Sequence, residues 1–192
     1  MASYIEHLGL ADFWDTLTAK EQSLLVEWNK SYKNERNIIA NTTDNSSGIP
    51  SARAFLDTMA GWAVSKREYN FARSLLGYAE KSNGTIVELH FVYCHSVELY
   101  YKERSCPDAL EKAKEYCMKD IELFPAYKAP LKKASGRIPP PSSFVQLAII
   151  YEKEGNYKQA IDICQLAINY KLSDGTKGGY ARRLARLRKK LD

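Results

Sequence analysis

Two residues of the types that bind transition metals stand four positions apart in this chain. His90 and Cys94 would share one face of a helix, because residues i and i+4 are neighbours there. His95 and Cys117 are conceivable further ligands of a zinc ion. A structural zinc site needs four converging ligands, and no second pair here has a recognisable spacing. We therefore expect ordinary packing or surface residues at these positions, and no cofactor.

Covalent catalysis would need a cysteine or serine beside a histidine that a third group orients. The chain has only three histidines, and no spacing places any of them beside a nucleophile. The glycines of residues 173–179 include a lysine but lack the order of a phosphate-binding loop. We expect no enzyme; the one alternative left open is a site assembled across several helices.

Positive charge is concentrated near the C-terminus. The net charge of the chain is +5, and residues 175–192 alone carry seven basic residues against one acid. Such residues can neutralise phosphates regardless of base sequence. Without interleaved aromatic residues, the favoured interpretation is the solvated face of a terminal helix, with nucleic-acid binding or an acidic protein partner as alternatives. The candidate polyanion contacts are Arg182, Arg183, Arg186, Lys189 and Lys190.

Residues 1–50 are predicted to form an N-terminal helical element and a linker. Thr18 and Glu21 have the Thr-x-x-Glu spacing of a capping box, in which each side chain satisfies a backbone N–H at a helix start. Apolar residues then recur with helical spacing as far as Trp28. Residues 41–48 are polar and rich in turn formers, which indicates a loop.

From residue 51 onward, amphipathic segments alternate with short polar turns, such as residues 65–68 and 153–156. This pattern is typical of antiparallel helix pairs, and it predicts an all-α fold. In the clearest pair, small residues would let the two helix backbones approach closely. The inward-facing residues of that pair are Phe144, Leu147, Ala148 and Tyr151, then Tyr157, Ala160, Cys164 and Ala167.

This pair resembles a tetratricopeptide repeat. With Pro141 as position one, an aromatic stands fourth, leucine and alanine stand seventh and eighth, and a tyrosine stands eleventh. The second helix continues the pattern, and the departure is Leu172, where proline is common in the family. Residues 53–84 match less completely, and residues 90–123 are more degenerate.

The resemblance implies three helix pairs over residues 51–174, stacked as a short right-handed α-solenoid. Residues 175–192 would then form a basic amphipathic capping helix. The spacing of the pairs is uneven, and residues 124–143 stand out as an insertion with five prolines. Because proline lacks an N–H and fixes φ, we expect regular helix to fail at both ends of this insertion.

The resemblance also implies a function, since the first helix of each such repeat lines a groove that holds a peptide or a partner helix. A scaffold or adaptor for protein–protein interaction is our leading hypothesis. The groove lacks the lysine and asparagine of the family's carboxylate clamp, so a partner with an apolar side chain and a basic group fits better. The alternative is that the groove packs against the N-terminal helix. The predicted groove residues are Asp57, Phe91, Cys94, Glu98, Tyr101, Lys102, Ile149, Glu152 and Lys153.

The location of the protein in the cell can be predicted from its composition and sequence pattern. No stretch approaches the roughly 18 apolar residues that cross a bilayer, and the first residues lack a basic region followed by an apolar run. The four cysteines show no Cys-x-x-Cys spacing, which favours free thiols. We therefore expect a cytoplasmic protein without a membrane partner.

Overall fold

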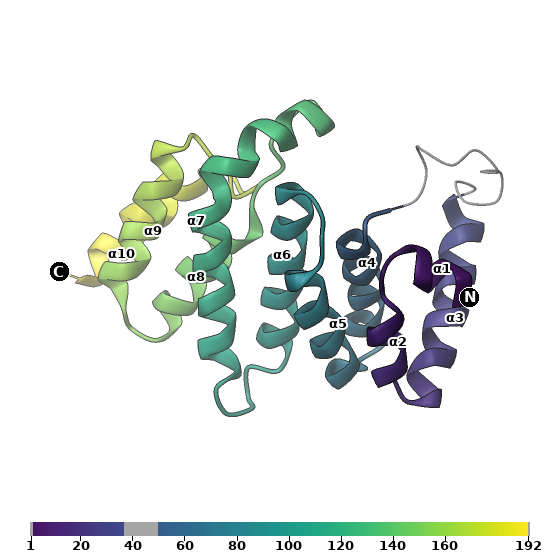
Figure 1. Ribbon diagram of the computed structural model, residues 1–192. Helices are drawn as coiled ribbons and strands as arrows, with labels where there is room; N and C mark the ends of the chain where they lie inside the picture. The colour runs from purple at the N-terminus through teal and green to yellow at the C-terminus, as the bar shows by residue number, and fades with distance from the viewer. Residues whose placement is uncertain (1, 37–49, 192) are drawn as a thin grey trace. The chain divides into compact units, whose positions relative to one another are not determined.

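The computed structural model describes residues 2–36 and 50–191 of the 192-residue chain (Figure 1). Over these ranges the chain forms ten α-helices and no strand, so the predicted all-α class is confirmed. The helices belong to two compact units, Met1–His95 and Ser96–Asp192. Their bounds are α1 Ala2–His7, α2 Ala11–Thr16, α3 Ala19–Arg36, α4 Ala52–Ser65, α5 Tyr69–Lys81, α6 Ile86–Lys102, α7 Ala109–Ser135, α8 Ser142–Lys153, α9 Tyr157–Asn169 and α10 Gly179–Leu191.

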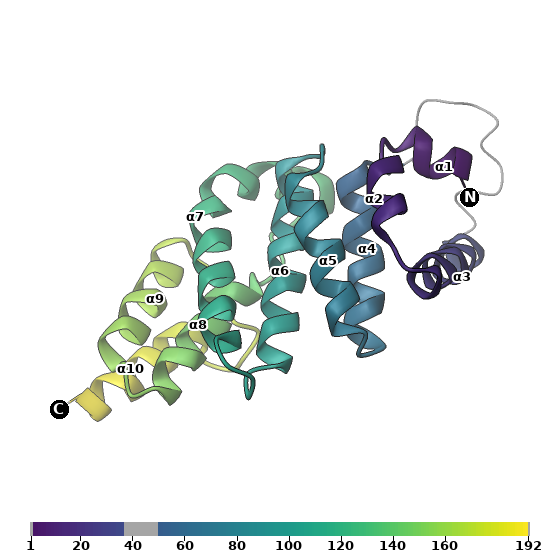
Figure 2. The ribbon, with the colours of Figure 1, turned by 60° about the horizontal axis from the view of Figure 1, so that its bottom comes forward.

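Helices α4 and α5 form a hairpin in the first unit, and Figure 2 shows them side by side. The chain turns between them at Arg67, whose φ of 63° is left-handed, within the turn predicted for residues 65–68. The Ser51 hydroxyl accepts a hydrogen bond from the Ala54 N–H and caps the start of α4. The two facing surfaces bury alanines together with large apolar residues, among them Leu56, Met59, Ala60, Ala63, Ala72, Leu75, Leu76 and Ala79.

The end of α5 is held by Arg53 of α4. Its guanidinium donates to the carbonyl oxygens of Ala79 at 3.1 Å, Ser82 at 2.6 Å and Thr85 at 3.0 Å. The last carbonyls of a helix have no partner within the helix, and a charged donor with a planar fork can satisfy several at once. This contact fixes the turn that leads from α5 into α6.

The N-terminal helices pack onto this hairpin. The predicted capping box is confirmed at the start of α3, where the Thr18 N–H donates to Glu21 Oε2 at 2.8 Å and the Glu21 N–H donates to Thr18 Oγ1 at 3.3 Å. The Trp28 ring lies 6.0 Å from the Phe71 ring of α5, and Phe13 of α2 lies 4.4 Å from the Tyr78 ring. The loop predicted at residues 41–48 lies outside the described residues.

In the second unit, α8 and α9 form the hairpin that the sequence showed most clearly. The predicted turn at residues 153–156 is confirmed, with Gly155 at a φ of +78°. The Asn156 N–H donates to the Tyr151 carbonyl and closes the end of α8. Phe144, Leu147, Ala148, Ala160, Cys164 and Ala167 are all fully buried.

The expectation that helix fails where the proline-rich insertion begins was wrong. Helix α7 continues through Pro125 and Pro130 to Ser135, and Figure 1 shows it changing direction toward its C-terminal end. Each proline removes one backbone hydrogen bond and costs a helix interior about 3 kcal/mol. Burial of Phe124 and Tyr127 offsets that cost, because each large aromatic side chain contributes a comparable free energy.

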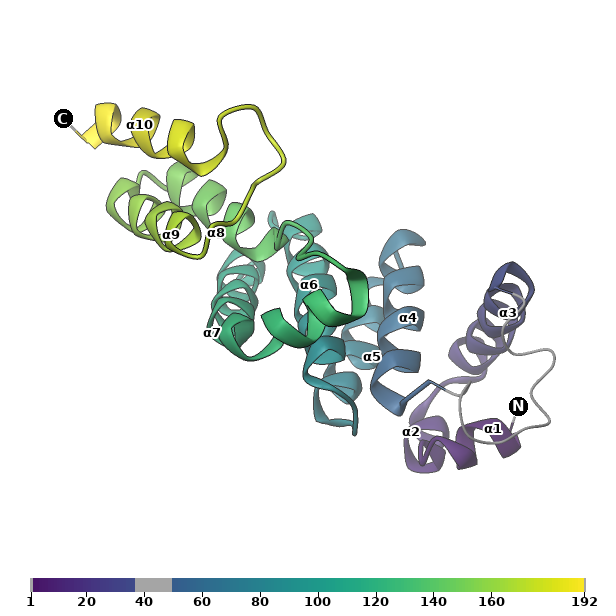
Figure 3. The same cartoon turned by 90° about the horizontal axis from the view of Figure 1, so that it is seen from above.

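Helix α10 covers the end of the second unit, as predicted for a capping helix. It begins at Gly179, packs against α9 and buries Tyr180, Leu184 and Leu187 (Figure 3). The chain between α9 and α10 is not helical. Helix α9 ends at Asn169, and Lys171 takes the left-handed conformation with a φ of 58°.

None of the described helices combines the length and the apolar character that crossing a bilayer requires.

Candidate functional site

The predicted groove residues fall in both units. Asp57 on α4 is buried, and its Oδ1 lies 2.7 Å from His95 Nδ1. One turn later, Gly61 leaves room for the imidazole, since an added Cβ would lie 3.1 Å from His95 Nε2. Asp57 therefore holds an imidazole and is not an exposed acid. Phe91 is the predicted groove residue of this unit that stays exposed, at 42%.

In the first unit, the two histidines considered for zinc have different partners. Cys94 Sγ lies 3.7 Å from His90 Nδ1, one turn apart on α6, as the spacing of four predicted. His95 points instead to Asp57. This unit thus pairs one histidine with a thiol and the other with a carboxylate, an arrangement that does not bring the three together as ligands of one ion.

In the second unit, α6 and α8 bring Tyr101 and Lys153 together. Lys153 Nζ donates to the Tyr101 hydroxyl at 3.0 Å and lies 5.7 Å from the centre of its ring. The guanidinium of Arg104 lies 4.9 Å from the same ring. The hydrogen bond from Lys153 is the main cause of a lowered pKa of the Tyr101 phenol, against an opposing contribution from burial. Two cations therefore flank one aromatic ring.

The same surface includes a glutamate that already forms an ion pair. Lys102 Nζ lies 3.0 Å from Glu98 Oε1, one turn away on α6, and both side chains are about half exposed. Ile149 on α8 is half-buried. We call Glu98, Tyr101, Lys102, Arg104 and Lys153 the Tyr101 surface. Sequence reasoning missed Arg104, which lies in the turn after α6 and carried no periodic signal.

Glu152, another predicted groove acid, binds the C-terminal helix instead. Its Oε2 accepts from Arg186 at 2.6 Å and its Oε1 accepts from Lys190 at 2.9 Å, while Arg183 lies 3.6 Å away. The Glu152 side chain is only 14% exposed. Burial opposes its charged form, but the hydrogen bonds from Lys190 and Arg186 outweigh burial and lower the pKa of the carboxyl. Glu152 therefore anchors α10 to α8.

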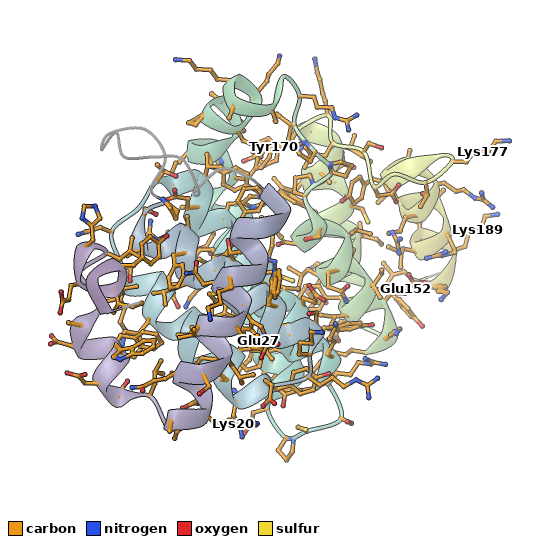
Figure 4. All side chains as sticks on the ribbon, turned by 90° about the vertical axis from the view of Figure 1, so that its right-hand side faces the viewer. Lys20, Glu27, Glu152, Tyr170, Lys177 and Lys189 are labelled. Atoms are coloured by element: carbon orange, nitrogen blue, oxygen red, sulfur yellow. The ribbon has the colours of Figure 1, made fainter. Side chains whose placement is uncertain are left out.

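Of the five candidate polyanion contacts, three thus share one carboxylate. Arg182 and Lys189 are exposed and form no ion pair with a described carboxylate. Figure 4 shows Lys177 and Lys189 extending away from the ribbon, with Glu152 on the same side of the second unit. The free positive charge of α10 is therefore smaller than its composition suggests.

The cysteines are free thiols, as expected. Cys117 and Cys164 are buried, and burial is the main cause of a pKa of about 11 for Cys164. A thiol with so high a pKa is a poor nucleophile at neutral pH, which agrees with a packing role for this residue.

We expect Glu152→Gln to lower the free energy of unfolding by about 1–2 kcal/mol at pH 7, since it removes the charge that three cations share. The folded-state pKa of Glu152 is lowered, so its contribution is complete above the ordinary glutamate value of about 4.3 and is lost as the pH falls through the folded value. Urea unfolding followed by circular dichroism at pH 7 and pH 3 would measure this. The exposed Glu122→Gln is the control; an equal effect of both changes would contradict the anchor.

An uncharacterized protein resembles this chain over most of its length. The chain is 29% identical over 171 residues to an uncharacterized protein of Aquifex aeolicus (strain VF5), and the alignment covers 84% of this chain and 81% of that protein. No family model matches the sequence, and no solved structure matches it. The likeness to tetratricopeptide repeats therefore rests on the residues of the α8–α9 hairpin and its weaker counterparts.

Proposed function

We propose that this protein is an interaction module of tetratricopeptide type that binds an acidic peptide segment of a protein partner at the Tyr101 surface. The observation that supports the proposal is the contact between Lys153 and Tyr101. Both occupy groove positions of the family pattern, on α8 and α6, and they are 52 residues apart in the chain. In such a module the helix pairs form a short solenoid and the first helices line its concave side.

The charges of the second unit favour an acidic partner rather than the basic one expected from sequence. Glu152 is occupied by α10, and Glu98 is paired with Lys102. The cations Arg104 and Lys153 are exposed beside the Tyr101 ring. A carboxylate of the partner can bind these cations, while an apolar side chain next to it can lie against Tyr101 and Ile149.

The strength of such binding can be bounded. Exposed ion pairs and cation–π contacts each contribute roughly 0.5–1 kcal/mol. Apolar contact with the tyrosine ring adds about 1.5–3 kcal/mol. We therefore expect weak binding, with dissociation constants in the high micromolar to millimolar range, roughly −4 to −6 kcal/mol. Salt should weaken the interaction but not abolish it, because the apolar contribution is not screened.

Selection of peptides from a random library on the intact protein tests this proposal. We expect enriched sequences to carry aspartate or glutamate within three residues of an apolar side chain. For the best peptide, Lys153→Glu should weaken binding at least tenfold by fluorescence anisotropy, because it reverses the charge beside the ring. Tyr101→Ala should weaken it similarly.

The matched control is Lys133→Glu, an exposed lysine on α7 in the same unit, which should leave the affinity unchanged. Enrichment of basic peptides, or equal weakening by both charge reversals, would contradict the proposal.

The nucleic-acid alternative has weaker support. Arg183, Arg186 and Lys190 are partly neutralised by Glu152, so α10 offers fewer free cations than a stripe for several successive phosphates needs.

A further inference from the structure

The turn before α10 and one side of that helix, as far as Lys189, line a hollow of about 610 Å³. The side chains that line it are mostly cationic, and a single carboxylate stands among them. The charged residues around the hollow are Lys177, Arg182, Arg183, Arg186, Lys189 and Asp174.

The carboxylate offsets only one of these positive charges, and it is also tied into the turn by hydrogen bonds. Asp174 Oδ1 accepts hydrogen bonds from the Thr176 N–H at 2.9 Å and from the Thr176 hydroxyl at 2.7 Å. By contrast, Lys177, Arg182 and Lys189 are exposed and form no ion pair with any carboxylate in the part of the chain that the structure describes. The hollow therefore has a surplus of positive charge, and it lies beside the positive end of the α10 dipole.

Arg183 lies near two carboxylates, but one of its nitrogens has no hydrogen-bond partner in the part of the chain that the structure describes. Its guanidinium lies 3.6 Å from Glu152 and 4.0 Å from Asp174, beyond ordinary hydrogen-bond distance. Its Nε is buried and has no hydrogen-bond partner among the described residues. Native structures rarely leave a buried donor unsatisfied, and an anionic oxygen is the partner that a guanidinium binds best.

The length of the row of cations along α10 indicates the length of the ligand. Arg182, Arg186 and Lys189 follow one face of α10, and the span of seven residues from first to last is roughly 10 Å at 1.5 Å per residue. That length suits two or three linked phosphates. A duplex-binding surface typically engages about 6–10 phosphates, which is more than this hollow provides.

We propose that this hollow binds a compact ligand with two or three linked phosphates, the chemistry shared by nucleoside polyphosphates and short inorganic polyphosphate. Lys177, Arg182 and Lys189 neutralise the phosphates at the rim, and Arg183 contributes positive charge from the wall. The site does not depend on peptide binding at the Tyr101 surface.

Isothermal titration of the intact protein with inorganic tripolyphosphate tests the site, with adenosine triphosphate and orthophosphate as comparison ligands. We expect one binding event for tripolyphosphate. The triple change Lys177→Ala, Arg182→Ala and Lys189→Ala should weaken it at least 30-fold, while circular dichroism stays unchanged because all three side chains are exposed.

The matched control removes the same residue types elsewhere in the second unit: Lys132→Ala, Lys133→Ala and Arg137→Ala, all exposed. It should change the affinity less than twofold. No measurable binding of tripolyphosphate, or equal weakening by the two triple changes, would overturn the proposal. Single-stranded RNA that binds through the same three residues, when tripolyphosphate does not, would overturn it in favour of nucleic acid.

Discussion

Replacing Phe124 with alanine is expected to lower the free energy of unfolding by about 3–5 kcal/mol, the usual cost of deleting a fully buried aromatic ring. Phe124 is 1% exposed, and its ring centre lies 5.6 Å from Phe144 on α8 and 4.9 Å from Tyr170 at the end of α9. It therefore joins α7 to the α8–α9 hairpin. The loss should appear as a lower urea midpoint by far-UV circular dichroism.

Two further variants make that result decisive. Phe124→Leu keeps most of the apolar volume and should cost less than half as much. Met118→Ala changes a side chain on the same helix that is 36% exposed and should cost less than 1 kcal/mol. A loss below about 1 kcal/mol for Phe124→Ala would mean that Phe124 does not join α7 to the hairpin.

We expect Trp28→Ala to lower the free energy of unfolding of the first unit by about 3–5 kcal/mol. Trp28 is 3% exposed and lies against Phe71, so its removal leaves a cavity between α3 and α5. Urea unfolding followed by the fluorescence of Trp14 and Trp62, which remain in this unit, would measure the effect.

The control for Trp28 is its neighbour Glu27, which is exposed on α3 and is labelled in Figure 4. Glu27→Ala should leave stability within about 0.5 kcal/mol of the unchanged protein. If Trp28→Ala also had so small an effect, the N-terminal helices would not be part of the core of the first unit.

Several elements could be predicted because their signals are local. The capping box of Thr18 and Glu21 joins residues three apart, and the helix turns at residues 65–68 and 153–156 follow from short polar interruptions of an apolar pattern. The apolar stripe of α10 likewise repeats every three or four residues. Each of these signals lies within one or two helical turns, so no knowledge of distant neighbours is needed.

In residues 124–135, the local signal of proline against helix is outweighed by tertiary packing. Proline opposes a helix through its own backbone, and the sequence offered no evidence of a compensating force. That force is the burial of Phe124 and Tyr127, which depends on where α8 and α9 lie in space.

The contacts of the candidate site residues also depend on distant parts of the chain. The sequence assigned Tyr101, Lys153, Asp57 and Glu152 alike to a partner-binding groove. Asp57 binds a histidine 38 positions away, and Glu152 binds cations 34 and 38 positions away. Pairing at such distances leaves no periodic trace in a single sequence.

By itself, the sequence determined that this protein is helical, where several of its helices begin and turn, and that its basic residues gather in a terminal helix. Those properties follow from hydrogen bonding and apolar spacing between near neighbours. Only the tertiary structure decided that α7 passes through two prolines, and which charges are neutralised and which stay exposed. The physical reason is that burial and ion pairing depend on side chains that folding brings together from distant parts of the chain.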